Sequence, residues 1–244
     1  SVTTTYTVTG EDAIGCSSSQ TITISVGTPS LTLSASSNTI CVGNSATLTA
    51  NGAISYPWNP GALTGTSTVV SPTTTTTYTV DGSDGTCSAT QTITLVVSPN
   101  ATVTASASSN TICAGSSATL TANGASTYTW NPGALTGTTT VVTPTITTTY
   151  TVDADNGLGC ITSTMVTVNV NSAPSLSIAA TSTALCTSGS VTLTATGATS
   201  YTWNPTAAAT ASIVDAPSVT TTYTVTGEDA IGCSSTQTIT ISVG

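Results

Sequence analysis

The sequence predicts an all-β protein made of tandem, small antiparallel β-sandwich domains. Tryptophan recurs at a nearly constant spacing, at Trp58, Trp130 and Trp203, and each is followed by Asn-Pro. Apolar and polar residues alternate with a period of two, the pattern of half-buried strands, and no apolar period of 3.6 extends over ten residues. Of the 244 residues, 63 are Thr, and β-branched residues favour strands.

The repeat boundaries follow from a second recurring motif. Tyr-Thr-Val begins at Tyr6, Tyr78, Tyr150 and Tyr223, with the same spacing as the tryptophans. A period of about 72 residues indicates a tandem array. We therefore expect repeats at 28–99, 100–173 and 174–244.

Residues 1–27 are expected to be the C-terminal strands of a preceding repeat. They match residues 218–244 except that Ser19 replaces Thr236. We interpret the chain as a segment of a longer array. The alternative is an N-terminal half-domain that strands from another molecule complete.

The second repeat illustrates the strand pattern. Apolar residues alternate with polar ones around Leu120, around Tyr150 and around Val168. Turn signals, such as Asn123-Gly124 and Asn156-Gly157, separate these runs. The pattern predicts six or seven short strands per repeat, which is typical of a β-sandwich.

A sandwich of about 72 residues buries little apolar surface and is marginally stable. We therefore expect the few recurring aromatic side chains to pack between its sheets. These core candidates are Trp58, Trp130, Trp203, Tyr78, Tyr150 and Tyr223.

Cysteines recur in two series, one in Thr-Ile-Cys or a close variant and one after a glycine-containing turn. We expect one disulfide per domain, worth about 4 kcal/mol for a loop of this length. The expected pairs are Cys41–Cys87, Cys113–Cys160 and Cys186–Cys233, with Cys16 unpaired. The alternative pairs neighbouring repeats, through Cys87–Cys113 and Cys160–Cys186, and leaves Cys233 unpaired.

The composition argues against catalysis and against several classes of partner. The chain has no Lys, Arg or His, and its nine charged residues are all acidic. It therefore lacks the usual general base and the cations that bind phosphate or anionic lipid. We expect no enzyme activity, no cofactor, no nucleic-acid partner and no membrane insertion.

Acidic pairs recur just before the second cysteine of each repeat, which favours turn chemistry. Asp153 and Asp155 resemble the start of a calcium loop, but Thr164 occupies the position of its bidentate acid. They are the calcium candidates of a chain expected to bind no metal tightly. Asn100 begins the single Asn-x-Thr sequon and is the candidate for glycosylation.

The ordered motifs resemble a known family. Each repeat runs from Thr-Ile-Cys and Thr-Leu-Thr-Ala through Tyr-x-Trp-Asn-Pro and Thr-Thr-Tyr-Thr-Val to Gly-Cys or a close variant. This order is similar to the immunoglobulin-like (Ig/PKD-like) repeats of Bacteroidota-type giant surface proteins, including gliding-motility adhesins. The resemblance covers all three repeats and residues 1–27, and it implies a secreted array at the cell surface.

The sequence therefore favours a non-enzymatic extracellular array, a stalk or filament that gives reach and mechanical continuity. Its expected partners are copies of itself or adjacent repeats, with surface glycans as further candidates. The alternative function is an adhesin module that binds carbohydrate or another surface directly. That alternative requires an exposed aromatic platform, so the exposure of the tryptophans separates the two.

Overall fold

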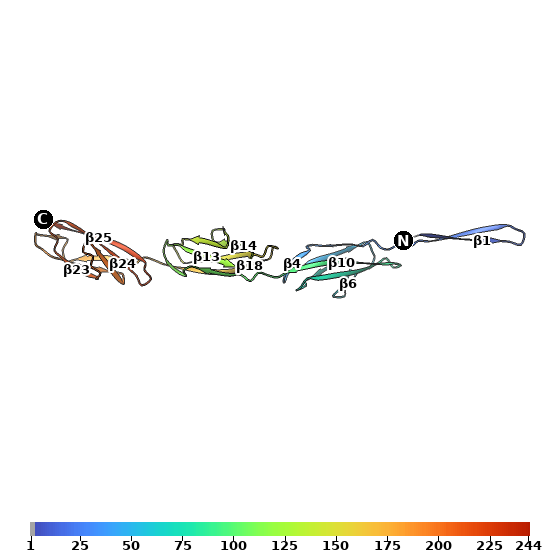
Figure 1. Ribbon diagram of the computed structural model, residues 1–244, viewed down its shortest axis with the longest axis horizontal. Coiled ribbons are helices and arrows are strands. Elements are labelled where there is room, and N and C mark those ends of the chain that lie inside the picture. Colours follow the sequence, from blue (N-terminus) through green and yellow to red (C-terminus); the bar gives the residue numbers. More distant parts are fainter. Residues whose placement is uncertain (1–2) are drawn as a thin grey trace. The chain divides into compact units, whose positions relative to one another are not determined.

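Every regular element that the computed structural model describes, over residues 3–244, is a β-strand (Figure 1). The predicted all-β class is confirmed. Ser1 and Val2, at the start of the predicted segment 1–27, lie outside the described residues. Across residues 3–244, no helix is long and apolar enough to cross a membrane.

The contacts divide the chain into two units. The first contains residues 1–100 together with the short segment 156–160. Its first two strands, β1 (Thr4–Glu11) and β2 (Ser17–Ile24), form an antiparallel hairpin. The remaining strands of this unit form a sandwich of two sheets, ordered β3-β5-β8 and β4-β10-β9-β6-β7. Their bounds are β3 Thr32–Ala35, β4 Thr39–Cys41, β5 Ala46–Asn51, β6 Pro57–Asn59, β7 Leu63–Thr64, β8 Ser67–Val70, β9 Thr76–Ser83 and β10 Ser88–Ser98.

The second unit contains residues 101–155 and 161–244. Its first sandwich has sheets ordered β11-β13-β16 and β12-β18-β17-β14-β15. The bounds are β11 Thr104–Ala107, β12 Thr111–Cys113, β13 Ala118–Asn123, β14 Thr127–Asn131, β15 Leu135–Thr136, β16 Thr139–Val142, β17 Thr148–Asp155 and β18 Ile161–Asn171.

The second sandwich of this unit has sheets ordered β19-β21-β23 and β20-β25-β24-β22. The bounds are β19 Ser177–Ala180, β20 Ala184–Leu185, β21 Val191–Thr196, β22 Ser200–Asn204, β23 Ser212–Asp215, β24 Thr221–Glu228 and β25 Ser234–Val243. Among the described residues, the first two sandwiches have eight strands each and the third has seven. The prediction of six or seven strands per repeat therefore holds for the third sandwich and is one strand too few for the first and second. It missed the two-residue strands β7 and β15.

The short strand that carries the first cysteine of each sandwich pairs parallel with the last strand. Thus β4, β12 and β20 lie beside β10, β18 and β25 respectively. The other strand pairs are antiparallel in the part of the chain that the structure describes. This parallel pairing fixes which end of the sandwich holds each cysteine.

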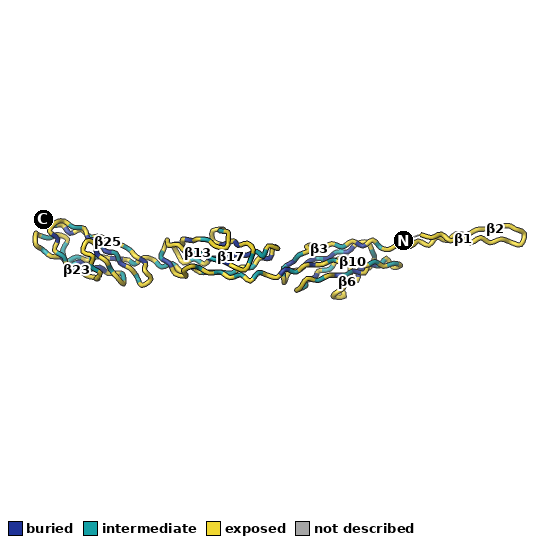
Figure 2. The backbone as a smooth tube through the Cα atoms, viewed as in Figure 1, coloured by how far each residue is buried: buried dark blue, intermediate teal, exposed yellow. Residues whose placement is uncertain are grey.

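Each sandwich has its own apolar core, and the dark blue residues of Figure 2 follow it along the alternating strands. The three tryptophans are at most 1% exposed, and the indole of Trp130 donates to the carbonyl of Gly137 at 3.1 Å. The six aromatic core candidates are all buried: Trp58, Trp130, Trp203, Tyr78, Tyr150 and Tyr223.

A second series of tyrosines closes a tight turn in each sandwich. The hydroxyl of Tyr128 accepts from the backbone N–H of Ala125 at 2.7 Å and donates to its carbonyl at 2.9 Å. Tyr56 and Tyr201 make the same pair of bonds three residues back. These bonds satisfy two backbone groups at a turn that the alternating pattern does not reveal.

The outward faces carry the threonines. Thr77 and Thr94 face each other across β9 and β10, with hydroxyl oxygens 2.8 Å apart. The equivalent pairs Thr149–Thr167 and Thr222–Thr240 are separated by 2.8 Å and 2.9 Å. Cross-strand hydroxyl pairs of this kind stabilise sheets modestly. They explain how strands can be rich in Thr without burying it.

Candidate functional site

Two disulfides join successive repeats. Cys41 bonds Cys160, and Cys113 bonds Cys233, over separations of 119 and 120 residues. In both bonds, the Thr-Ile-Cys cysteine of one repeat meets the second cysteine of the next. The expected pairs Cys41–Cys87, Cys113–Cys160 and Cys186–Cys233 are therefore wrong, and so are the alternative pairs Cys87–Cys113 and Cys160–Cys186.

The reason lies in the length of the last strand. Cys41 is opposite Ser98, at the end of β10, whereas Cys87 directly precedes the start of β10 at Ser88. These 11 residues extend about 35 Å at 3.2–3.4 Å per residue. A disulfide needs Cα atoms within about 7 Å. The two cysteines of one repeat thus lie at opposite ends of the sandwich.

The loop before Cys160 is shaped by Asn156. Its side-chain oxygen accepts from the backbone N–H of Leu158 at 2.9 Å and of Cys160 at 3.3 Å. Its side-chain amide donates to the hydroxyl of Ser98 at 2.7 Å and to the carbonyl of Pro99 at 3.0 Å. Ser98 is 3% exposed and Cys160 is 1% exposed. The crosslink is therefore supported by side-chain hydrogen bonds, and its Cys160 half is shielded from water while Cys41 is half-buried.

The second crosslink has a related arrangement with a different polar pair. Asp229 accepts from the backbone N–H of Ile231 at 2.8 Å and of Cys233 at 2.9 Å. Its other carboxylate oxygen accepts from the side-chain amide of Asn171, the residue opposite Cys113. Ser235 also donates its hydroxyl to the carbonyl of Pro174 at 2.6 Å. An acidic loop residue thus meets an amide donor, whereas the amide of Asn156 meets a hydroxyl and a carbonyl.

Three cysteines are free: Cys16, Cys87 and Cys186. The loop before Cys87 nevertheless resembles the crosslinked loops. Asp84 accepts from the backbone N–H of Thr86 at 2.9 Å and of Cys87 at 2.8 Å. Hydrogen bonds from Cys87 and Thr86 lower the pKa of the Asp84 carboxyl below its usual value.

The calcium candidates lie on β17, where Asp153 and Asp155 alternate along the strand. Asp153 accepts from the hydroxyl of Ser163 at 2.5 Å. Within residues 3–244, three or more acidic, cysteine or histidine side chains do not gather at one point as a metal site requires. The expectation that no metal binds tightly, with Asp153 and Asp155 as the calcium candidates, stays untested, as does glycosylation of the exposed Asn100.

The one carboxylate outside the recurring acidic pairs contacts a core tyrosine. The hydroxyl of Tyr223 donates to Asp215 at 2.6 Å. Burial, with this hydrogen bond and the adjacent carboxylate, raises the pKa of Tyr223 to about 12. Burial alone raises the pKa of Tyr78. The Asp215–Tyr223 hydrogen bond therefore ties the end of β23 to a core side chain of β24 in the third sandwich.

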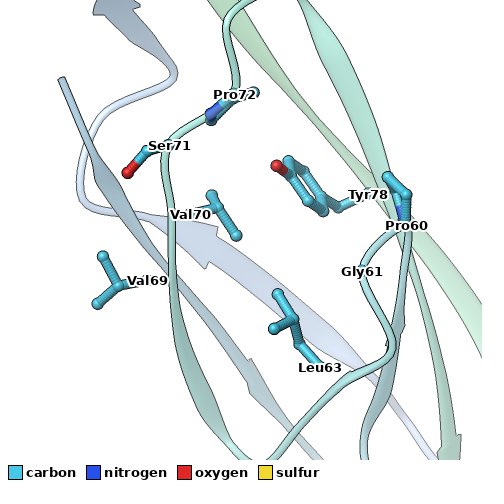
Figure 3. A pocket seen from close by; sticks show the side chains of 8 residues that line it. All are labelled: Pro60, Gly61, Leu63, Val69, Val70, Ser71, Pro72 and Tyr78. Atoms are coloured by element: carbon cyan, nitrogen blue, oxygen red, sulfur yellow. The ribbon is translucent and has the colours of Figure 1, made fainter. Parts of the chain in front are cut away.

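An open hollow of about 300 Å³ lies at the edge of the first sandwich (Figure 3). Tyr78, Val70 and Leu63 point into it, while Val69 points away on the other side of its strand. Its walls are completed by Pro60, Gly61, Val69, Ser71 and Pro72. This lining carries one hydroxyl besides that of Tyr78 and no charge, so it offers few groups for orienting a ligand.

The chain matches no family model and no curated protein. Among solved structures, a Ca2+-stabilised adhesin with which an Antarctic bacterium binds ice is 17% identical and has a TM-score of 0.38. That similarity covers 98% of this chain and 81% of the adhesin chain. An I-band fragment of titin is 12% identical with a TM-score of 0.46, over 90% of this chain and 100% of the fragment.

The N-terminal eight immunoglobulin domains of the Down syndrome cell adhesion molecule form a third similar structure. The identity is 13% and the TM-score 0.43, over 99% of this chain and 40% of that one. Because all three identities are low, the function proposed below rests on this chain's own contacts.

Proposed function

We propose that this chain is a non-enzymatic, extracellular run of sandwich repeats, 28–99, 100–173 and 174–244, that provides reach and mechanical continuity. The observation that carries the proposal is that disulfides join each repeat to the next. Two covalent connections then cross each junction: the backbone and a disulfide. Such a junction resists both separation and reorientation of its repeats more than a single linker does.

The disulfides also limit how far the chain extends if its sandwiches unfold. The backbone from Thr28 to Gly244 has 216 residue steps. The shortest covalent route has 13 steps to Cys41, 47 from Cys160 back to Cys113, and 11 from Cys233 to the end. At about 3.5 Å per residue, this reduces the maximum extension from roughly 760 Å to roughly 250 Å.

The chemistry of the surface favours this function over direct binding. The tryptophans, which were the candidates for an aromatic platform, are buried in the three cores. Described carboxylates such as Asp84, Asp153 and Asp215 bond neighbouring backbone or hydroxyl groups. Stable disulfides are typical of oxidising compartments, which supports an extracellular location. Lateral pairing of the chains into a filament stays a prediction.

The test is single-molecule extension between handles placed at residues 28 and 244. We expect a limit of roughly 250 Å before reduction and of roughly 760 Å after reduction with dithiothreitol. Cys87→Ser is the matched control: because Cys87 is free, it should leave the limit unchanged. A longer maximum extension in Cys87→Ser, or equal maximum extensions with and without reductant, would overturn the crosslinked array.

A further inference from the structure

The hairpin β1–β2 exposes residues that are buried in the third sandwich. Its strands carry the sequence of β24 and β25 apart from Ser19. Tyr6 and Val8 are 57% and 70% exposed, whereas their equivalents Tyr223 and Val225 are 0% exposed. Figure 2 shows the whole hairpin as exposed. One face of this hairpin therefore carries the apolar residues of a core surface, and it is exposed among the residues that the structure describes.

The third sandwich shows what covers such a face. There, β22 pairs with β24, and β20 pairs parallel with β25. The opposite sheet, β19-β21-β23, supplies the buried side chains of Leu193 and Ile213. All of these strands come from residues 174–217. The surface complementary to the hairpin is thus a polypeptide with the pattern of that segment.

The free Cys87 lies in a loop like those that form crosslinks, and the cysteine that would pair with it belongs to the same kind of segment. Its loop is ordered by Asp84 as the crosslinked loop of Cys233 is ordered by Asp229. In both observed crosslinks, such a loop meets the Thr-Ile-Cys cysteine of the preceding repeat. The equivalent cysteine of the segment 174–217 is Cys186. A single polypeptide with the pattern of residues 174–217 would thus both bury the hairpin and supply a cysteine to Cys87.

We propose that β1–β2 and the Cys87 loop form a docking site for a half-repeat polypeptide with the sequence pattern of residues 174–217. The half-repeat completes a sandwich on the face that contains Tyr6, Val8 and Ile22. Its short cysteine-bearing strand lies parallel to Ser25 and Val26, as Ala184 and Leu185 lie beside Ser242 and Val243. Its cysteine then bonds Cys87.

The bond forms by thiol–disulfide exchange with a small disulfide oxidant such as oxidised glutathione. The two cysteine thiols lose two protons and two electrons and form one S–S bond. The oxidant's own S–S bond breaks, and it accepts them as two thiols. This inference extends to Cys87 the crosslinking rule on which the proposed function rests.

The test combines the full chain with an isotope-labelled synthetic peptide of residues 174–217 in a glutathione redox buffer. We expect amide hydrogen exchange across residues 4–24 to slow by at least tenfold. We also expect a disulfide between Cys87 and Cys186 of the labelled peptide. A chymotryptic digest read by mass spectrometry detects it. Unchanged exchange, or labelled Cys186 distributed equally over Cys16, Cys87 and the chain's Cys186, would overturn the proposal.

Two variants separate docking from crosslinking. Cys87→Ser should keep the slowed exchange but lose the covalent link. Val8→Asp with Ile22→Asp should abolish both, whereas Thr5→Asp with Thr21→Asp, on the outward face, should abolish neither. The same digest reports Cys41–Cys160 and Cys113–Cys233. If these links are present and docking fails, only this inference fails; if they are absent, the proposed function fails as well.

Discussion

Asn171 donates its side-chain amide to the carboxylate of Asp229, a residue 58 positions later in the next repeat. The contact lies beside the Cys113–Cys233 bond, because Asn171 is opposite Cys113 and Asp229 accepts from the backbone N–H of Cys233. The hydrogen bond and the disulfide therefore favour the same docked loop, and each should be weakened by loss of the other.

Asn171→Asp should make the Cys113–Cys233 bond easier to reduce. The change removes a hydrogen bond to a charged group, worth about 1.5–3 kcal/mol, and places two carboxylates together. We expect half of the Cys113–Cys233 bond to be reduced at no more than about one tenth of the dithiothreitol concentration that the unsubstituted chain needs, measured by thiol labelling. Ser172→Asp adds the same charge at the neighbouring exposed position and is the control. An equal shift in both variants would show that the contact with Asp229 contributes nothing.

Trp130→Ala should unfold the second repeat at a much lower urea concentration. The indole is fully buried and donates to the carbonyl of Gly137. Large-to-small changes at such positions cost about 3–5 kcal/mol in free energy of unfolding. The control Val141→Ala is on the surface, where Val141 is 62% exposed. Hydrogen exchange along β17 reports the second repeat, and a cost below about 1 kcal/mol would contradict a core role for Trp130.

The third repeat should lose stability between about pH 10 and pH 12. Burial and Asp215 raise the pKa of Tyr223 to about 12 in the folded chain, against about 10 unfolded. A raised pKa means that the protonated tyrosine favours folding, so its contribution is complete below pH 10 and is lost as pH rises through 12.

Asp215→Asn should lower the pKa of Tyr223 and leave that of Tyr150 unchanged. Burial would still hold the pKa of Tyr223 above its ordinary value. The measurement is an ultraviolet difference titration of each protein against its Tyr223→Phe version. Ionisation of Tyr223 near pH 10 in the unsubstituted chain would contradict the contact with Asp215.

Gly124→Ala should destabilise the second repeat more than Gly115→Ala does. Both glycines have positive φ, 100° and 78°, so both substitutions carry the left-handed backbone penalty of about 1–2 kcal/mol. Only at Gly124 would the added Cβ also overlap the backbone carbonyl of Thr102; at Gly115 it would meet nothing within 4 Å. Equal urea midpoints for the two variants would contradict the close approach of residues 102 and 124.

The strands were predictable because burial in a sheet has the same period of two as the sequence. In β13, Ala118, Leu120 and Ala122 are buried and the threonines between them are not fully buried. The repeat spacing likewise fixed which strands recur. Thr-rich runs became outward faces because hydroxyl pairs such as Thr149–Thr167 satisfy one another.

The crosslinks were not predictable, because pairing depends on which strand ends lie together. The sequence separation of Cys41 and Cys87 says nothing about the parallel pairing of β4 with the far end of β10. Two signals were present but insufficient alone. Asn156-Gly157 has the sequence of an ordinary turn, and the acid or amide four residues before a cysteine recurs at Asp12, Asn156 and Asp229.

Disulfide mapping of the unreduced chain tests the crosslinked array most directly. Because the chain has no Lys or Arg, chymotrypsin or pepsin replaces trypsin, with free thiols blocked before digestion. We predict linked peptides that join Cys41 to Cys160 and Cys113 to Cys233, with Cys87 recovered as a blocked thiol. Peptides that join Cys41 to Cys87, or Cys113 to Cys160, would contradict the account.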